Sequence, residues 1–340
     1  MKALLIEEPG RARITERSEP VTAPGEVLLR LTTVGFCGSD LNTYRGLNPL
    51  VGYPRVPGHE IAGSIETVGS EVPNGLFAAG MEVTVLPYTA CGRCAACRRG
   101  RGNACQDNQT LGVQRDGALT EFIAVPWEKI VLADGLSRRE LALVEPLSVG
   151  FHAVDRGRVT ERDTVVVIGC GAVGLGAVAG ARTRGARTIA VDIDDAKLGI
   201  ARAAGAEHTV NTDPESLPAR IAELTHGEGA DVVVEAVGIP GTFVAAVNAA
   251  AFTGRVMYIG YAKTPVAYDT TLFVRKELDI LGARNATMAD FRAVMAMLRR
   301  REFPVSATVT RAVSLEGAGG ALDEWNRDPS RITRIHVDFS

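Results

Sequence analysis

The feature that constrains the fold most is a glycine loop placed directly after an apolar strand. Residues 164–174 read Thr-Val-Val-Val-Ile-Gly-Cys-Gly-Ala-Val-Gly, which contains the pattern GxGxxG. In this pattern Gly169 permits a tight turn, Gly171 lets the backbone approach a pyrophosphate, and Gly174 lets the following helix pack closely on the strand. The start of that helix offers unpaired N–H groups to phosphates. The segment predicts a dinucleotide-binding unit; the alternative is a glycine-rich turn with a purely structural role.

An acidic residue at the end of the next strand supports the first interpretation. Asp192 follows the expected strand 187–191 and lies 23 residues after Gly169. A carboxylate at this place accepts hydrogen bonds from the ribose hydroxyls and repels a 2′-phosphate. No arginine follows it, because the next residues are Ile193, Asp194 and Asp195. We therefore expect the cofactor to be NAD rather than NADP.

The hydrophobic pattern predicts a class α/β protein. After residue 163, expected strands alternate with expected helices, as is typical of a doubly wound parallel sheet. The strands are expected at 164–168, 187–191, 231–237, 255–260 and 278–281, and the helices up to residue 184 and at 196–204, 242–250 and 288–300.

Residues 1–130 have a different character, with short apolar runs broken by Gly and Pro about every ten residues. Such spacing is typical of a β-rich domain. A chain of 340 residues corresponds to about two domains. We expect a β-rich domain at 1–148, a nucleotide-binding domain at 149–284, and a segment at 285–340 that returns to the first domain.

Charge and hydropathy exclude several other classes of protein. The formal net charge is −3, and the longest basic stretch is residues 98–101, so nucleic acid has no basic surface to bind. At the N-terminus an acidic residue follows after four apolar residues, too early for a signal peptide. The uncharged run 164–181 contains five glycines, which favour a buried strand and helix over a membrane span. We expect a cytoplasmic protein with neither nucleic acid nor membrane as partner.

Four of the six cysteines lie close together: Cys91, Cys94, Cys97 and Cys105 fall within 15 residues. Short Cys-x-x-Cys steps allow four sulfurs to face one centre, as in a closed tetrahedral zinc site with a structural role. An iron–sulfur cluster is the first alternative. A disulfide pair is a second, which the expected cytoplasmic location disfavours.

A second group of metal-binding residues is dispersed along the chain. Cys37 and His59 each stand beside glycines, in Gly-Phe-Cys-Gly-Ser-Asp and Pro-Gly-His-Glu. A cysteine, a histidine and one carboxylate can hold a catalytic zinc ion with an open fourth position. Taken singly, such residues are more often a buried thiol and a turn histidine. Spacing alone does not choose the third ligand.

Taken in order, these segments resemble the zinc-dependent medium-chain dehydrogenases over essentially the whole chain. The Glu145-Pro-Leu-Ser segment resembles the polyol, sugar-acid and threonine dehydrogenase branch, because other alcohol dehydrogenases have a cysteine at that position. The resemblance implies a GroES-like β-rich catalytic domain and a Rossmann domain. The segments that carry it are residues 35–40, 57–60, 91–105 and 145–148, the glycine loop with Asp192, and residues 235–238.

The resemblance also implies roles for single residues. Cys37, His59 and Glu145 would hold the catalytic zinc, with Glu60 beside it as an occasional ligand. Asp40 would accept a hydrogen bond from the distal nitrogen of His59. Ser39 would touch the substrate hydroxyl and begin a proton relay. The second, structural zinc would be bound by Cys91, Cys94, Cys97 and Cys105.

Other polar residues receive weaker predictions. Family members often carry a histidine where this chain has Asn42, and Gly117-Ala118 replaces a more frequent glycine pair. We expect His152 to have a packing role. Four side chains are candidates for substrate contact: Tyr44, Arg115, Arg284 and Asn285. Three histidines are expected at solvated positions: His208, His226 and His336.

The predicted function is NAD-dependent oxidation of a secondary hydroxyl in a polyol, sugar or sugar acid, with two zinc ions per chain. An NAD-dependent L-threonine 3-dehydrogenase is the alternative enzyme. A non-catalytic NAD-binding sensor on the same fold is the alternative of another class. The expected partner is a small-molecule substrate, and the family relationship implies a homodimer or homotetramer.

Overall fold

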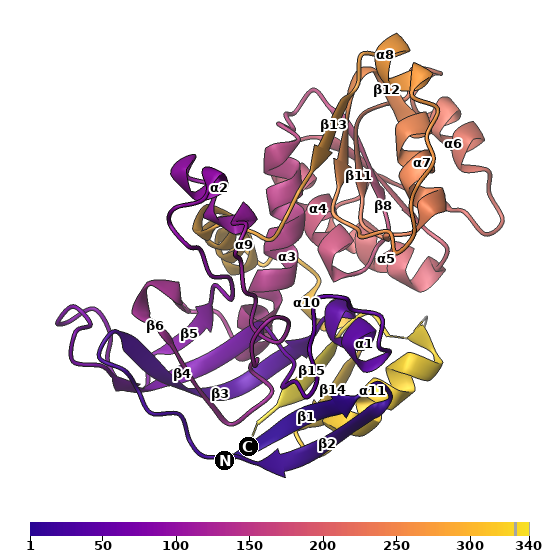
Figure 1. Ribbon diagram of the computed structural model, residues 1–340. Coiled ribbons are helices and arrows are strands. Elements are labelled where there is room, and N and C mark those ends of the chain that lie inside the picture. The colour runs from indigo at the N-terminus through magenta and orange to yellow at the C-terminus, as the bar shows by residue number, and fades with distance from the viewer. Residues whose placement is uncertain (330–331, 340) are drawn as a thin grey trace. The chain divides into compact units, whose positions relative to one another are not determined.

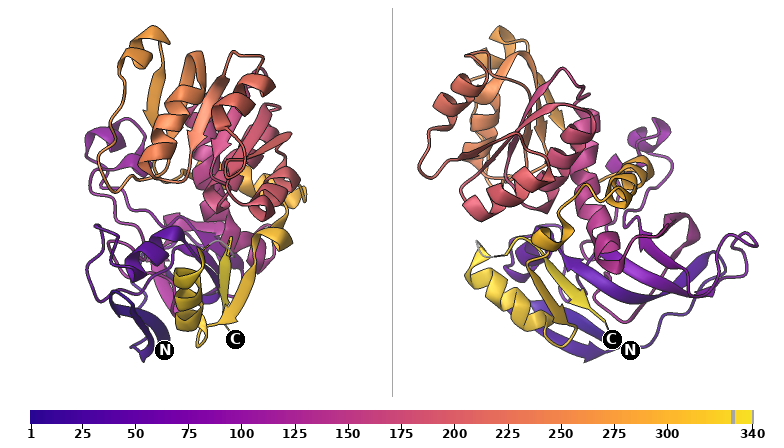
Figure 2. Two further views of the ribbon diagram at one scale, coloured as in Figure 1. Left: turned by 90° about the vertical axis from the view of Figure 1, so that its right-hand side faces the viewer. Right: turned by 180° about the vertical axis from the view of Figure 1, so that it is seen from behind.

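The computed structural model describes residues 1–329 and 332–339 (Figures 1 and 2). The chain divides into two compact units, the first made of Met1–Glu145 and Val309–Ser340 and the second of Pro146–Thr308. The return to the first unit begins at Val309, whereas the sequence prediction placed it at residue 285. Among the described helices none is long and apolar enough to cross a membrane.

The first unit is β-rich, as predicted. Its main sheet has the strand order β14-β15-β3-β4-β5-β7, and β6 pairs with β3. Because β6 runs on into β7, the pairing joins β3 to β5 and closes these strands into a barrel. The strands of this unit are β1 (Lys2–Glu8), β2 (Arg11–Glu16), β3 (Glu26–Phe36), β4 (Glu60–Val68), β5 (Glu82–Val85), β6 (Phe122–Pro126), β7 (Ile130–Leu132), β14 (Arg311–Ser314) and β15 (Ile335–Asp338).

The helices of this unit are short. They are α1 (Gly38–Tyr44), α2 (Ala95–Arg98), η1 (Gly102–Ala104), η2 (Trp127–Lys129) and α11 (Ala318–Arg327).

Strand β15 joins residues that are far apart in the sequence, because it pairs antiparallel with β3. Ile335 and Val337 of β15 lie opposite Phe36 and Val34 of β3, and all four belong to the apolar core of the unit. Since successive side chains alternate between the faces of a strand, His336 lies on the opposite face. Figure 1 shows β15 beside β3, beneath helix α1.

The second unit is a six-stranded parallel sheet, which confirms the Rossmann prediction. The order β10-β9-β8-β11-β12-β13 places the first strand of each half, β8 and β11, at the centre, and the strand order changes direction between them. Its strands are β8 (Thr164–Ile168), β9 (Arg187–Asp192), β10 (His208–Asn211), β11 (Ala230–Glu235), β12 (Ala250–Tyr258) and β13 (Asp279–Gly282).

The sheet's helices are α4 (Ala172–Thr183), α5 (Asp195–Ala204), α6 (Leu217–Leu224) and α7 (Pro240–Ala249); α8 (Thr271–Arg275), α9 (Met288–Arg299) and α10 (Val305–Thr308) follow. Helix α3 (Arg138–Arg156) leads into the unit. A buried contact holds α9 to it, since His152 Nδ1 lies 3.0 Å from Asp290 Oδ2. This contact, together with the buried Phe291 of α9, explains why residues 285–308 belong to the second unit. His152 thus has the packing role expected of it.

Candidate functional site

The glycine loop has the geometry that its sequence predicts. Gly169 follows β8 with φ +98°, and a Cβ there would come within 2.6 Å of Val237 Cγ2. A Cβ on Gly174 would lie 1.8 Å from the Gly169 carbonyl oxygen, so α4 can approach β8 only without a side chain. Gly171 has nothing within 4 Å of its Cβ position and precedes the first residue of α4. The loop therefore leaves open space directly at the N-terminus of a 12-residue helix, where a pyrophosphate finds unpaired N–H groups.

Asp192 holds the glycine loop to the end of β9. Its Oδ2 accepts a hydrogen bond from the Cys170 N–H at 2.7 Å, and its Oδ1 accepts from the N–H groups of Ile193 and Asp194 at 2.8 and 3.2 Å. Two carboxylate oxygens offer about four acceptor sites, so Asp192 retains capacity for a ligand hydroxyl. Cys170, in contrast, is fully buried, and its thiol packs against the Val191 carbonyl.

Exposed apolar side chains follow three strands at the same edge of the sheet. Ile193 comes directly after β9, and Tyr261 follows β12; each is more than 70% exposed. Val237 and Ile239 follow β11 and are about half exposed. Carboxyl ends of parallel strands share one edge, and ligands of doubly wound folds bind there. Sequence reasoning missed these residues, although an apolar residue just after a predicted strand end is a usable signal.

The second group of candidate ligands comes together at the junction of β3 and β4. Cys37 follows β3 and precedes α1, His59 precedes β4, and Glu60 is its first residue. The pairing of Gly35 with Glu60 brings these segments side by side. One donor atom from each of Cys37, His59 and Glu60 lies within 4.8 Å of the other two. His59 and Glu60 are buried, and Cys37 is half-buried.

Asp40 has a different role from the one predicted. Its Oδ2 accepts from the Cys37 N–H at 2.8 Å and its Oδ1 from the Gly58 N–H at 3.1 Å, while His59 Nδ1 makes no hydrogen bond with any described residue. The carboxylate therefore ties together the backbones that carry the two ligands, instead of orienting the imidazole. The capping geometry of α1 explains the difference, because it points the Asp40 side chain back at the start of its own helix.

The structure groups a different carboxylate with Cys37 and His59 from the one that the resemblance implies. Glu145 is buried near the group, but its carboxylate accepts a hydrogen bond from the Tyr88 hydroxyl, and it does not belong to the group of donor atoms. Glu60 lies in the group instead, because its strand begins directly after His59. The sequence prediction gave Glu145 as the third ligand and Glu60 as an occasional one, and the choice between them stays a prediction.

Burial and neighbouring acidic side chains shift the pKa values of the group. Burial raises the pKa of Glu60 to about 7, although the Arg334 guanidinium opposes the rise and Glu145 adds to it. Burial lowers the pKa of His59, but interactions with Cys37, Glu145 and Asp40 raise it well above its usual range. A thiolate and carboxylates enclosed in one place favour a bound cation.

Three buried polar atoms without a hydrogen-bond partner among the described residues indicate that a metal fits here. Ser39 Oγ, His59 Nδ1 and Glu60 Oε2 are inaccessible to solvent and make no hydrogen bond with the described part of the chain. Sulfur, imidazole nitrogen and carboxylate oxygen are the donors that zinc takes in catalytic sites, where a fourth position stays open. Cys37, His59 and Glu60 therefore fit a zinc ion of that kind, with Ser39 beside it.

The four-cysteine lobe gathers all of its sulfurs at one centre. Donor atoms of Cys91, Cys94, Cys97 and Cys105 lie within 4.8 Å of one another. Cys94 Sγ is 3.5 Å from Cys97 Sγ and 3.9 Å from Cys105 Sγ, and none of the four forms a disulfide. Sulfurs on one tetrahedral ion at ~2.3 Å stand about 3.8 Å apart. Backbone N–H groups of Gln106 and Cys97 lower the pKa of Cys94 to about 6, which favours the ligating thiolate. The geometry supports a single structural zinc.

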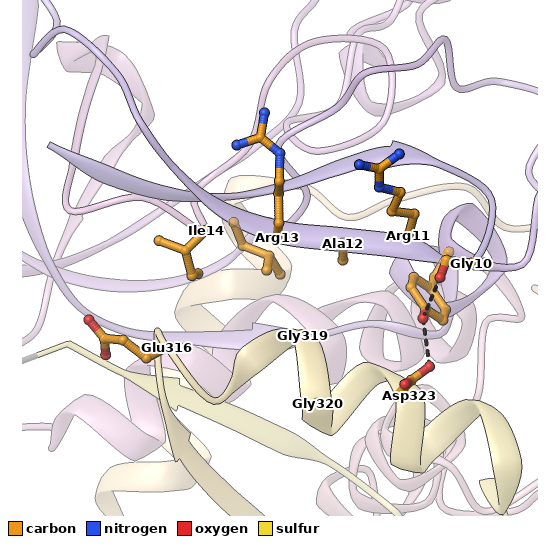
Figure 3. A pocket seen from close by; sticks show the side chains of 11 residues that line it. Gly10, Arg11, Ala12, Arg13, Ile14, Glu316, Gly319, Gly320 and Asp323 are labelled. Atoms are coloured by element: carbon orange, nitrogen blue, oxygen red, sulfur yellow. Dashed lines mark hydrogen bonds between the residues drawn. The ribbon is translucent and has the colours of Figure 1, made fainter.

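The candidate substrate residues are dispersed. Tyr44 is buried, and its hydroxyl lies within hydrogen-bond distance of Asp323 Oδ1 (2.6 Å) and of the Gly10 carbonyl oxygen (2.9 Å). It lines a polar pocket between β2 and α11 instead of joining the metal-binding group (Figure 3). Burial lowers the pKa of Arg115, and Glu26, at the opposite end of β3 from Cys37, opposes this shift. Arg284 and Asn285 follow β13 in the second unit, and their contact with substrate stays a prediction.

Of the three histidines expected in solvent, His336 is placed differently. Its side chain is fully buried, because its strand β15 lies inside the sheet, between β14 and β3.

Comparison with known proteins agrees with both units. The alcohol dehydrogenase GroES-like domain matches residues 23–135, and the zinc-binding dehydrogenase domain matches residues 172–300. The L-galactonate-5-dehydrogenase of Escherichia coli K12 is 31% identical over 310 residues, which cover 91% of each chain. The chain belongs to the zinc-dependent medium-chain dehydrogenases.

Further relatives place this dehydrogenase within the family. The sorbitol dehydrogenase of Bacillus subtilis is 36% identical over 289 residues, covering 83% of this chain and 81% of that protein. An alcohol dehydrogenase structure (rspB) from Escherichia coli CFT073, complexed with the cofactor NADH, superimposes with a TM-score of 0.92 at 29% identity, covering 100% of this chain and 99% of that one. The chain thus lies in the polyol and sugar-acid branch and is an oxidoreductase of the alcohol dehydrogenase type.

Proposed function

We propose that this dehydrogenase oxidises a secondary hydroxyl of a polyol, a sugar or a sugar acid with NAD. The observation that carries the proposal is the buried group of Cys37, His59 and Glu60, which unites a sulfur, a nitrogen and an oxygen donor. An NAD-binding sensor has no need of such a group, so the group favours an enzyme.

The first unit supplies the residues for the chemistry. Cys37, His59 and Glu60 would hold zinc and leave one position for the substrate hydroxyl. When bound, zinc supplies a Lewis acid that lowers the pKa of this hydroxyl, and NAD supplies the hydride acceptor. Ser39 Oγ, buried and without a partner among the described residues, would accept a hydrogen bond from this hydroxyl and pass its own proton on, as the first member of a relay that carries the proton towards solvent. Asp40 keeps the two ligand segments in register through its hydrogen bonds to their backbones.

The second unit supports the choice of NAD. Gly169, Gly171 and Gly174 leave room for the pyrophosphate, and Asp192 has acceptor capacity for the ribose hydroxyls. The same carboxylate repels the 2′-phosphate of NADP. The exposed apolar side chains at the carboxyl edge of the sheet, with Ile193 next to Asp192, offer surfaces to planar rings.

The test is a turnover screen of the purified protein with NAD or NADP. Polyols, aldoses, aldonic acids and L-threonine are compared, and zinc per chain is measured by mass spectrometry. We expect two zinc ions, turnover with a polyol, sugar or sugar acid, and an NAD preference of about 100-fold or more in kcat/KM, equivalent to about 2.7 kcal/mol. L-Threonine as the best substrate would show the alternative enzyme, and one zinc without turnover would show the sensor.

We also propose that the chain self-associates as a homodimer or homotetramer. Strand β13 lies at the edge of the second unit's sheet, and its Ile280 is partly exposed. Phe252 of β12 and Val274 of α8 are more exposed still. An unpaired strand edge with exposed apolar side chains is suited to pair with a second copy.

A further inference from the structure

Glu235 is a buried acid that the proposed chemistry does not use. It is the last residue of β11, and its side chain is fully buried. Residues 235–238, which begin with it, are one of the segments that carry the resemblance to the family, but they contain no candidate metal ligand. A buried carboxylate is costly unless hydrogen bonds compensate it, so the groups that it meets indicate its task.

One oxygen of Glu235 holds the loop that follows β11. Oε1 accepts hydrogen bonds from the backbone N–H groups of Val237 and Gly238, at 2.9 and 2.7 Å. The Thr242 hydroxyl, in the first turn of α7, lies 2.7 Å from the same oxygen. These contacts on one carboxylate oxygen fix the short loop 236–239 between the end of β11 and the start of α7.

The same residue meets the loop that follows β12. Its carbonyl oxygen accepts from the Ile259 N–H at 2.9 Å and from the Gly260 N–H at 3.3 Å. A Cβ on Gly260 would lie 2.5 Å from Glu235 Oε2 and 2.5 Å from the Gly238 nitrogen, so the two loops can approach only without a side chain there. Oε2 itself is buried and makes no hydrogen bond with any described residue. The carboxylate is thus enclosed between the loops after β11 and β12.

The loop after β11 also lies against the glycine loop. The Ala236 N–H donates to the Ile168 carbonyl at 2.9 Å, at the end of β8. A Cβ on Gly169 would come within 2.6 Å of Val237 Cγ2. Because Glu235 holds the backbone N–H of Val237, its carboxylate fixes the residue that packs on the first glycine of the loop.

The strand order indicates which half of the cofactor these loops border. Neighbouring strands follow one another as β9-β8-β11-β12. Asp192 at the end of β9 suits a ribose of NAD, and the glycine loop at the end of β8 suits the pyrophosphate. A dinucleotide that continues in the same direction reaches the ends of β11 and β12 with its nicotinamide half. Val237 and Tyr261 follow these two ends and are 47% and 72% exposed.

We infer that Glu235 is a positioning residue for the nicotinamide half of NAD. Its enclosed carboxylate does not reach the ligand itself, but it fixes the loops after β11 and β12 to one another and against the glycine loop. The inference rests on the use of NAD under the proposed function. It gives the segment 235–238 a task in cofactor binding.

The experiment measures the binding of NADH and of ADP to the purified full chain. NADH binding is followed by the fluorescence of its reduced ring, and ADP binding by calorimetry. ADP contains the adenosine and both phosphates but lacks the nicotinamide half. In Glu235→Ala we expect NADH to bind about tenfold more weakly, because hydrogen bonds to a charged group are lost, while the affinity for ADP stays within about twofold of wild type.

Three further variants separate positioning from packing. Glu235→Gln keeps an oxygen for the backbone donors of the loop and should restore NADH binding. Asp192→Ala should weaken NADH and ADP binding alike, since both ligands contain the adenosine ribose. Asp163→Ala is the matched control, because Asp163 is a buried carboxylate that accepts from the Thr160 N–H at 2.7 Å, just before β8 at the opposite edge of the same sheet. It should lower the melting temperature but leave NADH affinity unchanged.

If Glu235→Ala does not fold, Glu235→Asp takes its place, because it keeps the charge but withdraws both oxygens from the loop by one methylene group. Wild-type NADH affinity in the folded variant would overturn the inference. An equal loss of NADH and ADP binding would also overturn it, because the whole nucleotide site would then be loosened.

Failure of the proposed function gives a different result. If wild-type protein itself binds no NADH, the proposed cofactor is wrong and the inference falls with it. If wild type binds NADH and the Glu235 variants bind it equally well, only the role of Glu235 is contradicted.

Discussion

At the scale of single residues, the centre depends on how two buried carboxylates are partnered. Glu60 accepts from Arg334, and Glu145 accepts from Tyr88. Arg334 leaves one Glu60 oxygen without a partner among the described residues, beside Cys37 and His59. The sequence alone does not say which of the two carboxylates binds the metal, because that depends on the side chain that each one contacts after folding.

Matched glutamine variants test this ranking. Glu60→Gln keeps an acceptor for Arg334 but removes the anionic ligand, so we expect zinc to fall from two per chain to one and kcat to fall by about 100-fold or more. Glu145→Gln should keep both metals and lose less activity. Zinc per chain and turnover are measured for both variants, and retention of NADH binding serves as the folding control. Loss of metal in Glu145→Gln alone would restore Glu145 as the ligand.

The burial of His336 makes the stability of the folded protein depend on pH. Its pKa is lowered to about 3 in the folded protein, so between that value and its usual pKa near 6.5 only the unfolded chain binds the proton. The free energy of unfolding is therefore highest near neutral pH and falls as the pH drops below about 6.5, because the unfolded chain then gains a proton that the folded protein does not bind. Between pH 7.5 and 5, wild type should lose about 2 kcal/mol more free energy of unfolding than His336→Val. Denaturant titrations at both pH values measure this difference; equal losses would contradict it.

At the scale of elements, the cysteine lobe is too small to be stable by packing. Helix α2 has four residues, none of them buried, and η1 has three, of which only Asn103 is buried. A segment without an apolar core depends on the bonds to its metal for its structure. The spacing of the cysteines made this element recognisable from the sequence before any fold was known.

Cys97→Ser tests the metal's contribution to this element. We expect loss of the four-cysteine zinc and a fall in melting temperature, because a structural zinc site contributes directly to folding energy. Ser39→Ala is the complementary variant, expected to keep both zinc ions and the melting temperature while it lowers kcat. Zinc analysis and thermal unfolding are the measurements. A wild-type melting temperature in Cys97→Ser would argue against a structural role.

At the scale of the whole molecule, the periodic segments made the two-unit architecture predictable. The expected helix 288–300 and strand 164–168 agree with α9 and β8 to within one residue. Helix α3 escaped notice because Pro146 lies within it, and β10 with α6 because their segment is short and polar. Glu60 and Arg334 meet only through the pairing of β15, β3 and β4, which no local pattern of the sequence reports.

Self-association is tested on the edge of the second unit's sheet. Ile280→Lys in β13 places a charge on an edge that we expect to pair with a second copy, so the assembly should shift towards smaller species. Light scattering during gel filtration measures the mass. Val21→Lys alters a residue that is 91% exposed in the first unit and should leave the mass unchanged. An unchanged mass in Ile280→Lys would exclude this edge as the interface.

The position of Arg334 in the chain has a consequence for biosynthesis. It is 274 residues from Glu60, and the whole second unit is synthesised between them. While the ribosome is still making that unit, Cys37, His59 and Glu60 have emerged without the strand that completes their surroundings. Domains generally fold as units during synthesis. The Rossmann unit can therefore fold before the metal centre does, and zinc captured by the nascent chain would meet an unfinished site. We therefore expect zinc to bind this centre late, after the ribosome has synthesised the segment that contains Arg334.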